Sequence, residues 1–338
     1  MIITIEENIK VSILCPVYNH EKYIRQALES FLAQKTDFRY EVIVNDDAST
    51  DRSAEIIREF AEKYPDIIVP LFHEENTYSK GISPIGKFMI PVARGQYFAF
   101  CEGDDYWTDE NKLQIQVDWM DSHPEYSMCA HNTRSIHCDT GKTELYNSRY
   151  KEDRDLTLRD VLHGVNGVYH ATSVLVRANF IIEPPDFYYI SEKHKVGDDP
   201  LAITHAIYGK IHYINRTMSV YRIKSTPTAW SSRIHENACI IDRLHGAVEM
   251  YEALKKHIPD EYMELLEKTL LDYKWELLQA EGKFSELRRP PFDKIFKEKE
   301  LKQRLWIYMK QYLPGAYRLY LKLIGHEESL PETMKKKK

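Results

Sequence analysis

The chain has 338 residues, of which 43% are hydrophobic and 29% charged, proportions typical of soluble globular proteins. This length suits one large domain or two smaller ones, and the composition excludes a chain that is disordered throughout. The formal net charge of −6 argues against a general nucleic-acid-binding protein, so we expect no nucleic acid among its partners.

The cysteines and the N-terminal segment favour a cytoplasmic protein. The five cysteines are scattered and lie mostly inside apolar runs, which predicts reduced, buried thiols instead of a disulfide framework. The segment from Met1 to Lys10 is charged and lacks the apolar stretch of a signal peptide. No apolar run has the length needed to cross a bilayer.

Strand-forming and helix-forming segments alternate in the first part of the chain. Short apolar runs predict buried strands at Val11–Cys15, Glu41–Val44, Ile67–Phe72 and Tyr97–Cys101. Apolar residues with helical spacing predict helices from Ile24 to Leu32, from about Asp51 to Lys63 and from Asn111 to Asp121, and a loop with a helix between residues 76 and 95. Pro70 lies inside the third strand and predicts that this strand is at a sheet edge.

This alternation predicts an α/β fold with a Rossmann-like, mostly parallel sheet flanked by helices. Ligands of such sheets bind outside the carboxyl ends of the strands. Polar residues follow three of the predicted strands, at Pro16–Asn19, Asp46-Asp47 and Asp104-Asp105. We therefore expect these segments to meet at one edge of the sheet.

The pattern changes twice further along the chain. The middle part is richer in strands, which are predicted at Tyr126–Ala130, Ser173–Val176, Ile211–Ile214 and Met218–Tyr221. From about Ile234 onward the pattern is helical, and Pro314-Gly315 divides the last stretch into two short helices. We predict a domain of residues 1–232, with a first part at 1–125 and a second part at 126–232, and a C-terminal helical region at 233–338.

Three acidic pairs are candidates for the chemistry, namely Asp46-Asp47, Asp104-Asp105 and Asp198-Asp199. Neighbouring carboxylates repel each other, and a divalent cation offsets this repulsion. Mg²⁺ or Mn²⁺ prefers oxygen ligands and commonly bridges carboxylates and substrate phosphates. A single pair is more simply explained as a solvated turn, but two pairs at the ends of predicted strands favour a metal and phosphate site.

The order of these motifs resembles that of glycosyltransferase family 2. The residues that carry the resemblance are Pro16-Val17-Tyr18-Asn19, the run from Asn45 to Asp51, the run from Cys101 to Trp107, Gly197-Asp198-Asp199-Pro200-Leu201 and Ser219-Val220-Tyr221-Arg222. The resemblance extends from about Val11 to Trp230 and does not cover the later helices. It implies a GT-A fold, a nucleotide-sugar donor that is often linked to UDP, Mn²⁺ or Mg²⁺ as cofactor, and inversion at the anomeric carbon.

The resemblance implies that residues 1–125 bind the nucleotide sugar and that residues 126–232 form the acceptor side, and it assigns the donor site. Pro16, Val17 and Tyr18 line the pocket of the base and ribose, with Asn19 in the same motif. Asp47 accepts a hydrogen bond from the base, and Asp46 supports it. Asp104 and Asp105 match the motif that contacts the metal and the ribose. That motif usually begins with Asp, and Glu102 stands in its place. We expect Asp105 to contact the metal, together with Asp104, which is nearer the ribose.

On the acceptor side, Asp198 matches the general base and Asp199 is its close competitor. A neighbouring carboxylate raises the pKa of a carboxyl group, which makes it a better base. Local sequence alone would explain Gly197-Asp198-Asp199-Pro200 as a loop turn. Arg222 follows an apolar strand, where its guanidinium could bind the diphosphate or form an ordinary surface ion pair.

Together these features predict a metal-dependent, inverting glycosyltransferase. It would move a sugar from a nucleotide diphosphate, by expectation UDP, to a glycan or lipid-linked acceptor in cell-surface polysaccharide synthesis. One alternative is a nucleotidyltransferase, which would need a Gly-rich basic loop after the first strand. Residues Pro16 to Glu21 do not supply such a loop. The other alternative is a nucleotide-binding module of the same fold without turnover.

The segment 301–324 mixes aromatic and basic residues, as helices at a membrane interface do. This pattern raises the hypothesis of peripheral contact with the inner face of the membrane. Helices that pack on the protein itself have a similar composition, so both interpretations stay open.

Overall fold

The structure is a computed structural model that describes residues 9–182, 184–188, 198–227, 229–233 and 237–323. The chain divides into two compact units, residues 1–232 and residues 233–338. All the strands that the structure describes belong to the first unit.

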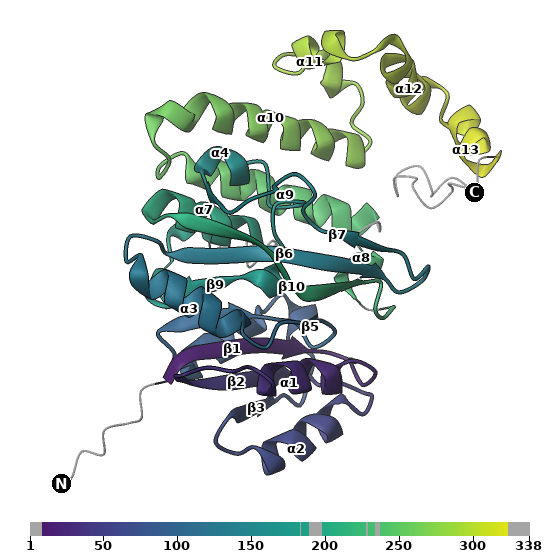
Figure 1. Ribbon diagram of the computed structural model, residues 1–338. Coiled ribbons are helices and arrows are strands. Elements are labelled where there is room, and N and C mark those ends of the chain that lie inside the picture. Colours follow the sequence, from purple (N-terminus) through teal and green to yellow (C-terminus); the bar gives the residue numbers. More distant parts are fainter. Residues whose placement is uncertain (1–8, 183, 189–197, 228, 234–236, 324–338) are drawn as a thin grey trace. The chain divides into compact units, whose positions relative to one another are not determined.

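A ten-stranded sheet forms the middle of the first unit (Figure 1). Its strands follow the order β3-β2-β1-β4-β9-β6-β10-β5, and β7 and β8 pair with β6 and β10. The strands are β1 (Ile9–Val17), β2 (Arg39–Asp46), β3 (Ile68–Phe72), β4 (Tyr97–Phe100), β5 (Tyr106–Trp107), β6 (Met128–His137), β7 (Thr143–Leu145), β8 (Arg154–Leu156), β9 (Leu175–Arg177) and β10 (Ile211–Ile223).

The first four strands in this order are parallel, as the strand–helix alternation predicted. In the register of the sheet Val17 lies opposite Asp46 and Leu14 lies opposite Phe100. The polar residues that follow β1, β2 and β4 therefore emerge at the same edge. The prediction from Pro70 is confirmed, because β3 is the outermost strand on that side and a proline has no N–H for a further neighbour.

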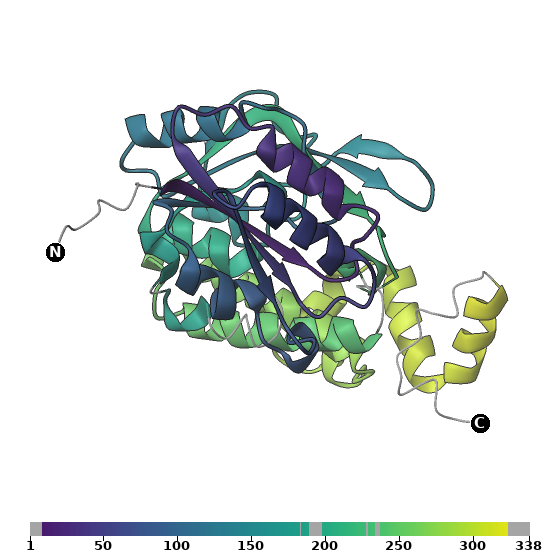
Figure 2. The same cartoon turned by 90° about the horizontal axis from the view of Figure 1, so that it is seen from below.

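The second half of the sheet is mixed. β9 is antiparallel to both β4 and β6, whereas β10 runs parallel to β6. The β6–β7 hairpin projects from the body of the unit (Figure 2). The separate strands predicted at Ile211–Ile214 and Met218–Tyr221 are wrong, because β10 is one continuous strand. Its pairing with β6 shifts in register between Ile214 and Ser219, so a polar interruption in the sequence is absorbed without ending the strand.

Helices pack on the sheet through their apolar faces. Ile24, Ala27, Leu28 and Phe31 of α1 are fully buried, as their spacing predicted. Residues 76–95 form short helical turns instead of one helix. The helical elements of this unit are α1 (Ile24–Leu32), α2 (Ser53–Lys63), η1 (Tyr78–Lys80), η2 (Ile85–Met89), η3 (Ile90–Val92), α3 (Lys112–Ser122), α4 (Leu158–Val161), η4 (Ala171–Ser173), α5 (Asn179–Ile182) and α7 (Asp198–Tyr208), and α8 (Trp230–Arg233) ends at the boundary between the units.

The described secondary structure of the second unit consists of helices joined by turns and loops. The unit has an apolar core of its own. Trp275, Phe284, Leu287 and Phe296 are buried there with Ile307 and Tyr317. In the part of the chain that the structure describes, every helix falls short of the length and hydropathy that crossing a membrane requires. The elements of this unit are α9 (Asn237–Leu254), η5 (Asp260–Tyr262), α10 (Met263–Ala280), η6 (Glu286–Arg288), α11 (Asp293–Glu298), α12 (Leu301–Tyr312) and α13 (Pro314–Leu323).

None of the five cysteines, all of which lie in the described residues, forms a disulfide bond there. Cys15, Cys101 and Cys129 are buried, as their apolar surroundings predicted. Cys138 is exposed and Cys239 is half-buried, so for these two the prediction of burial is wrong.

A buried carboxylate joins β1 and β2 to the chain just before β4. Glu41 of β2 is fully buried and accepts hydrogen bonds from the Ser12 hydroxyl at 2.6 Å and from the Arg94 backbone N–H at 2.8 Å. The Arg94 guanidinium donates two further bonds, from Nε at 2.8 Å and from Nη2 at 2.6 Å. The Ser12 hydroxyl in turn accepts a bond from Gly95 N–H at 2.8 Å. Three neighbouring strands are thus tied together below the edge where the polar segments meet.

We predict that Arg94→Met lowers the unfolding free energy of the first unit by about 1.5–3 kcal/mol, the contribution of a hydrogen bond to a charged group, because the Arg94 side chain is itself 54% exposed. The reason is that the Glu41 side chain is only 1% exposed and loses its guanidinium partner. Arg25→Met is the matched control, because Arg25 makes the same two-bond contact to Glu59, whose side chain is 57% exposed. It should change stability by roughly 0–1 kcal/mol. Amide exchange in β1 and β2 at increasing urea measures both, and equal effects would contradict the prediction.

Candidate functional site

The loops after β1 and β2 are cross-linked at the carboxyl edge of the sheet. The backbone N–H of Asn19 donates to the Ser49 hydroxyl at 2.9 Å, and the Thr50 N–H donates to the Asn19 side-chain oxygen at 2.8 Å. Asn19 and Ala48 both have left-handed backbones, with φ of 58° and 60°. Such conformations are uncommon for residues other than glycine and often occur at functional sites.

Asp46 and Asp47 lie side by side in sequence but differ in their contacts. Asp47 is buried, and its carboxylate accepts bonds from Thr77 N–H at 2.8 Å, the Thr77 hydroxyl at 2.6 Å and Tyr78 N–H at 2.9 Å. One oxygen of Asp46 accepts a bond from Ser49 N–H at 3.2 Å, whereas the other is buried without a partner. Burial raises the pKa of Asp46. Asp47 therefore holds the loop that begins at Thr77 against the predicted donor site.

The residues from Glu102 to Asp105, which we call the acidic loop, follow β4 and lie directly against the end of β1. Gly103 N–H donates to the Pro16 carbonyl at 3.0 Å. A Cβ atom at position 103 would lie 2.8 Å from Val17 Cγ2 and 3.0 Å from the His20 ring. Only glycine fits between these neighbours. The structure thus brings together the Pro16–Asn19 segment and the acidic loop, as strand order predicted.

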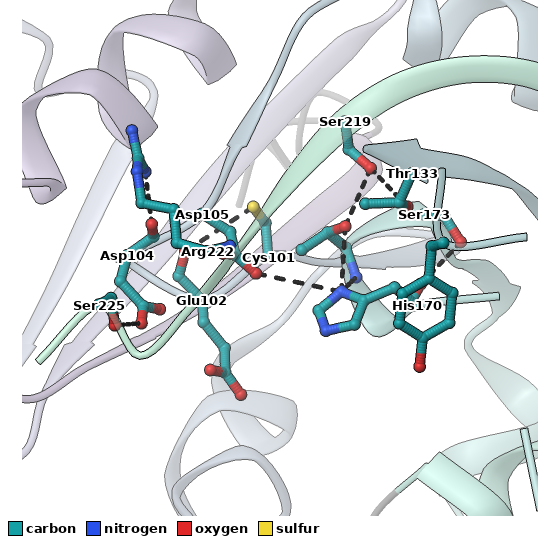
Figure 3. Close-up of polar contacts among 12 residues, drawn as sticks. Cys101, Glu102, Asp104, Asp105, Thr133, His170, Ser173, Ser219, Arg222 and Ser225 are labelled. Atoms are coloured by element: carbon teal, nitrogen blue, oxygen red, sulfur yellow. Dashed lines mark hydrogen bonds and ion pairs between the residues drawn. The ribbon is translucent and has the colours of Figure 1, made fainter. Parts of the chain in front are cut away.

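Each carboxylate of the Asp104-Asp105 pair has one oxygen that is satisfied and one that is not. Asp105 accepts a bond from Arg222 N–H at 2.7 Å through Oδ1, and Asp104 accepts a bond from the Ser225 hydroxyl through Oδ2. Asp105 Oδ2 and Asp104 Oδ1 are buried without hydrogen-bond partners. Figure 3 shows Asp105 between Arg222 on one side and His170 on the other, with His170 Nδ1 4.0 Å from Asp105 Oδ2.

Burial and mutual repulsion raise the pKa values of carboxyl groups in the acidic loop. Burial raises the pKa of Asp105 well above its ordinary value, and the negative charges of Asp104 and Glu102 raise it further. Glu102 is partly open to solvent, but protein atoms crowd its carboxyl group and raise its pKa together with the charges of Asp104 and Asp198. Since the charge of Asp198 acts on Glu102, the third acidic pair lies near the acidic loop.

The third pair begins helix α7, and the structure distinguishes its two members. Asp199 Oδ1 accepts a bond from Val165 N–H at 3.0 Å, and a Cβ atom at Gly164 would lie 3.3 Å from both of its oxygens. Asp199 thus holds a tight turn in place. The residue Asp198 is exposed, yet crowding around its carboxyl group and the charge of Asp199 raise its pKa to about 6. The Gly197 of this predicted motif lies outside the described residues.

Arg222 is enclosed by the protein. Its guanidinium lies over the rings of Tyr23 and Tyr106, at 4.8 and 4.5 Å from their centroids. It donates to the Asp104 carbonyl oxygen and to Gln26 Oε1. A diphosphate contact by this guanidinium stays a prediction, whereas the observed bonds fix the backbone of the acidic loop.

An aromatic cluster lies between the two groups of carboxylates. The rings of His170 and Tyr221 are stacked at 3.8 Å, and Tyr146 meets His170 edge-on at 5.3 Å. The charges of Asp105 and Glu102 contribute to a raised pKa of Tyr221, after burial, and the charge of Asp198 does so for Tyr146. Burial lowers the pKa of His170 to about 3, so its ring is neutral. No sequence pattern marks Tyr146 for this site, because its contacts are entirely tertiary.

The carboxylates of the acidic loop are candidate metal ligands. Among the residues that the structure describes, no group of three or more His, Cys, Asp or Glu side chains is arranged to hold an ion. The chemistry of the acidic loop nevertheless fits a hard cation. Two buried carboxylate oxygens lack partners, and Mg²⁺ or Mn²⁺ is commonly held by only one or two carboxylates together with substrate phosphates.

Comparison with known proteins identifies relatives. The model of the family described as glycosyl transferase family 2 matches residues 12–182. The uncharacterized protein Rv1520 of Mycobacterium tuberculosis is 37% identical over 245 residues, which cover 72% of this chain and 67% of that protein. The minor teichoic acid biosynthesis protein GgaB of Bacillus subtilis is 25% identical over 281 residues, which cover 80% of this chain and 29% of GgaB.

Solved structures share the fold. The crystal structure of S. aureus TarS 1–349 is similar with a TM-score of 0.57 and 18% identity, over 97% of this chain and 91% of that one. The mannosyltransferase PcManGT from Pyrobaculum calidifontis, in complex with GDP-Man and Mn²⁺, gives a TM-score of 0.50 and 18% identity, over 90% and 84% of the two chains. At these identities the likeness concerns the fold alone, and it agrees with the predicted α/β architecture.

The contacts of Asp47 predict a local effect of its removal. Asp47→Ala takes away three bonds to Thr77 and Tyr78, and bonds to a carboxylate contribute about 1.5–3 kcal/mol each. We expect amide exchange at Thr77 and Tyr78 to become about tenfold or more faster, because the loop opens more easily. Asp66→Ala, at an exposed position before β3, should leave this exchange unchanged. Unaltered exchange in Asp47→Ala would show that other contacts hold the loop.

Proposed function

The chain belongs to glycosyl transferase family 2, and from this premise we propose that it is an inverting, metal-dependent enzyme of cell-surface polysaccharide synthesis. Its donor would be a nucleotide diphosphate sugar, with UDP as the expected nucleotide, and its acceptor a hydroxyl of a glycan or of a lipid-linked glycan. Relatives named for teichoic acid biosynthesis and for poly(ribitol-phosphate) β-glucosyl transfer support this class of product. Free cysteines are consistent with a cytoplasmic location.

One observation carries the proposal. The acidic loop, the ends of β1 and β2, and the start of α7 converge at one edge of the sheet, although they are far apart in the sequence. Three groups of carboxylates that repel one another are useful only if they bind positive charge or accept protons. A nucleotide diphosphate leaving group and an acceptor hydroxyl supply both needs.

The proposed roles follow from these positions. Pro16, Val17, Tyr18 and Asn19 would line the nucleotide pocket with Asp46 and Asp47. Asp105 and Asp104 would hold Mn²⁺ or Mg²⁺ through the oxygens that lack protein partners. When bound, the ion would neutralise the charge on the departing diphosphate. Arg222 would act by positioning the acidic loop, since its guanidinium bonds to the Asp104 carbonyl oxygen. TarS with UDP-GlcNAc and PcManGT with GDP-Man and Mn²⁺ support such a donor and cofactor.

Asp198 is proposed as the general base. It would take the proton of the acceptor hydroxyl while that oxygen attacks the anomeric carbon and the bond from this carbon to the diphosphate breaks. The electron pair of the broken bond leaves with the diphosphate, and the configuration inverts because the hydroxyl attacks from the face opposite the diphosphate. Asp199 would support Asp198 through its charge and through its bond to Val165. The cluster of Tyr146, His170 and Tyr221 would offer ring faces to a sugar between the two carboxylate groups.

We predict that Asp105→Asn lowers sugar transfer by about 10²–10³-fold, the usual effect of losing one group that stabilises developing charge. It should also reduce the gain in UDP affinity that Mn²⁺ gives, measured by calorimetry with and without the ion. Asp118→Asn, an exposed position on α3, is the control and should behave as the wild type. Full transfer by Asp105→Asn would contradict the proposal. A wild-type protein that binds UDP-sugar but never releases UDP would instead indicate a binding module.

The two members of the third pair should behave differently. Asp198→Asn should lower kcat by about 10²–10⁴-fold with little change in donor KM, because it removes only the proton acceptor. Asp199→Asn should lower kcat less and lower the melting temperature, because Val165 N–H loses its carboxylate acceptor. The opposite ranking of the two kcat values would reverse the assignment of the base.

The pH profile provides a separate test of the base. The pKa of Asp198 is raised to about 6, so transfer should fall as the pH decreases through that value and Asp198 becomes protonated. The charge of Asp199 is one cause of the raised pKa. Asp199→Asn should therefore move the acidic limb of the kcat profile to lower pH. A limb that stays in place would argue against Asp198 as the titrating base.

A further inference from the structure

Helix α12 carries a stripe of large apolar side chains that face solvent. Leu301, Leu305, Tyr308 and Tyr312 have exposed fractions between 38% and 65%. Their spacing of four, three and four residues places them on one face of this helix of 12 residues. We call these four side chains the α12 stripe.

The opposite face of α12 packs against the core of the second unit. Ile307 is buried, and Trp306 packs against the core of the second unit with Tyr317. An ordinary surface helix presents polar residues opposite such a face. Helix α12 instead has an apolar face toward its own core and a second one toward solvent, which indicates a contact that the described residues do not supply.

The exposed apolar surface continues beyond this helix. Leu313, between the two helices, and Leu319 and Tyr320 of α13 are exposed as well. Seven of the thirteen large hydrophobic side chains that are exposed in the described residues therefore lie between positions 301 and 320. This concentration marks one surface instead of the scattered single residues that are normal on soluble proteins.

The charge of this segment narrows the choice of partner. The sequence from Leu301 to Gly325 contains no Asp or Glu and five basic residues, in a chain whose formal net charge is −6. Lys302 is exposed directly beside the stripe. The guanidinium of Arg288 lies over the rings of Tyr308 and Tyr312, at 4.9 and 5.5 Å from their centroids. Cationic groups therefore border the apolar side chains.

This combination fits an anionic lipid surface. Leucine side chains enter the boundary of the acyl chains, tyrosine rings lie at the level of the headgroups, and lysine and arginine bind lipid phosphates. We propose that the α12 stripe, with the exposed side chains of Leu313, Leu319 and Tyr320, docks on an anionic lipid bilayer as a peripheral contact. This proposal stands apart from the proposed function, because it does not depend on the acidic loop or on Asp198.

The test uses the full chain and flotation with lipid vesicles. One set of vesicles is phosphatidylcholine, and the other contains one quarter phosphatidylglycerol. The wild type should float with the anionic vesicles and much less with the neutral ones. The double variant Leu301→Glu, Leu305→Glu should float at least tenfold less, because it places two carboxylates in the stripe. Both positions are exposed, so the melting temperature should not change.

The matched control is Val92→Glu, Leu145→Glu, which alters two exposed apolar residues of the first unit and should float as the wild type does. Light scattering reports the oligomeric state of each protein. A wild type that stays at the bottom of the gradient overturns the proposal, and so does a stripe variant that floats as well as the control. If the stripe variant instead converts a dimer into a monomer without altering flotation, the surface is a contact between copies and the lipid proposal fails.

Discussion

Repulsion among Glu102, Asp104 and Asp105 is the constraint on which the first unit depends. Asp105 is buried beside like charges, and burial first, followed by the charges of Asp104 and Glu102, raises its pKa. The protein holds it in place with backbone contacts, since Arg222 N–H bonds to Asp105 and Gly103 N–H bonds to Pro16. The carboxylates are thus held close together at the end of a rigid sheet, where bound positive charge would offset their repulsion.

The surroundings of the acidic loop are correspondingly rigid. Glu41 ties β1, β2 and the chain before β4 together toward the amino ends of these strands, and Asp47 fixes the loop at Thr77 near their carboxyl ends. Asn19 and Ala48 hold left-handed backbones where the two loops meet. A site built on strand ends and cross-linked loops keeps its carboxylates in place before any ligand arrives, which reduces the reorganisation that binding requires.

In the second unit the main feature is the apolar surface of α12, part of which is buried and part exposed. Its core of Trp275, Phe284 and Leu287 explains one face of α12, whereas the side chains of the α12 stripe remain 38–65% exposed although Arg288 lies over its two tyrosine rings. Apolar side chains left in water over a basic segment are unfavourable for an isolated protein. They become favourable at a surface that offers hydrocarbon and negative charge together.

The sequence by itself determined the strand–helix order and the edge position of β3, because hydrophobic periodicity and the missing N–H of proline are local properties. It also determined the meeting of polar segments at one sheet edge, because the carboxyl ends of parallel strands lie at the same edge. It did not reveal that β10 is continuous, that Arg222 is enclosed by Tyr23 and Tyr106, or that Asp199 bonds to Val165. These features depend on contacts between residues distant in the chain. Neighbouring aspartates look alike in a sequence, and only the tertiary structure decides which hydrogen bonds each of them makes.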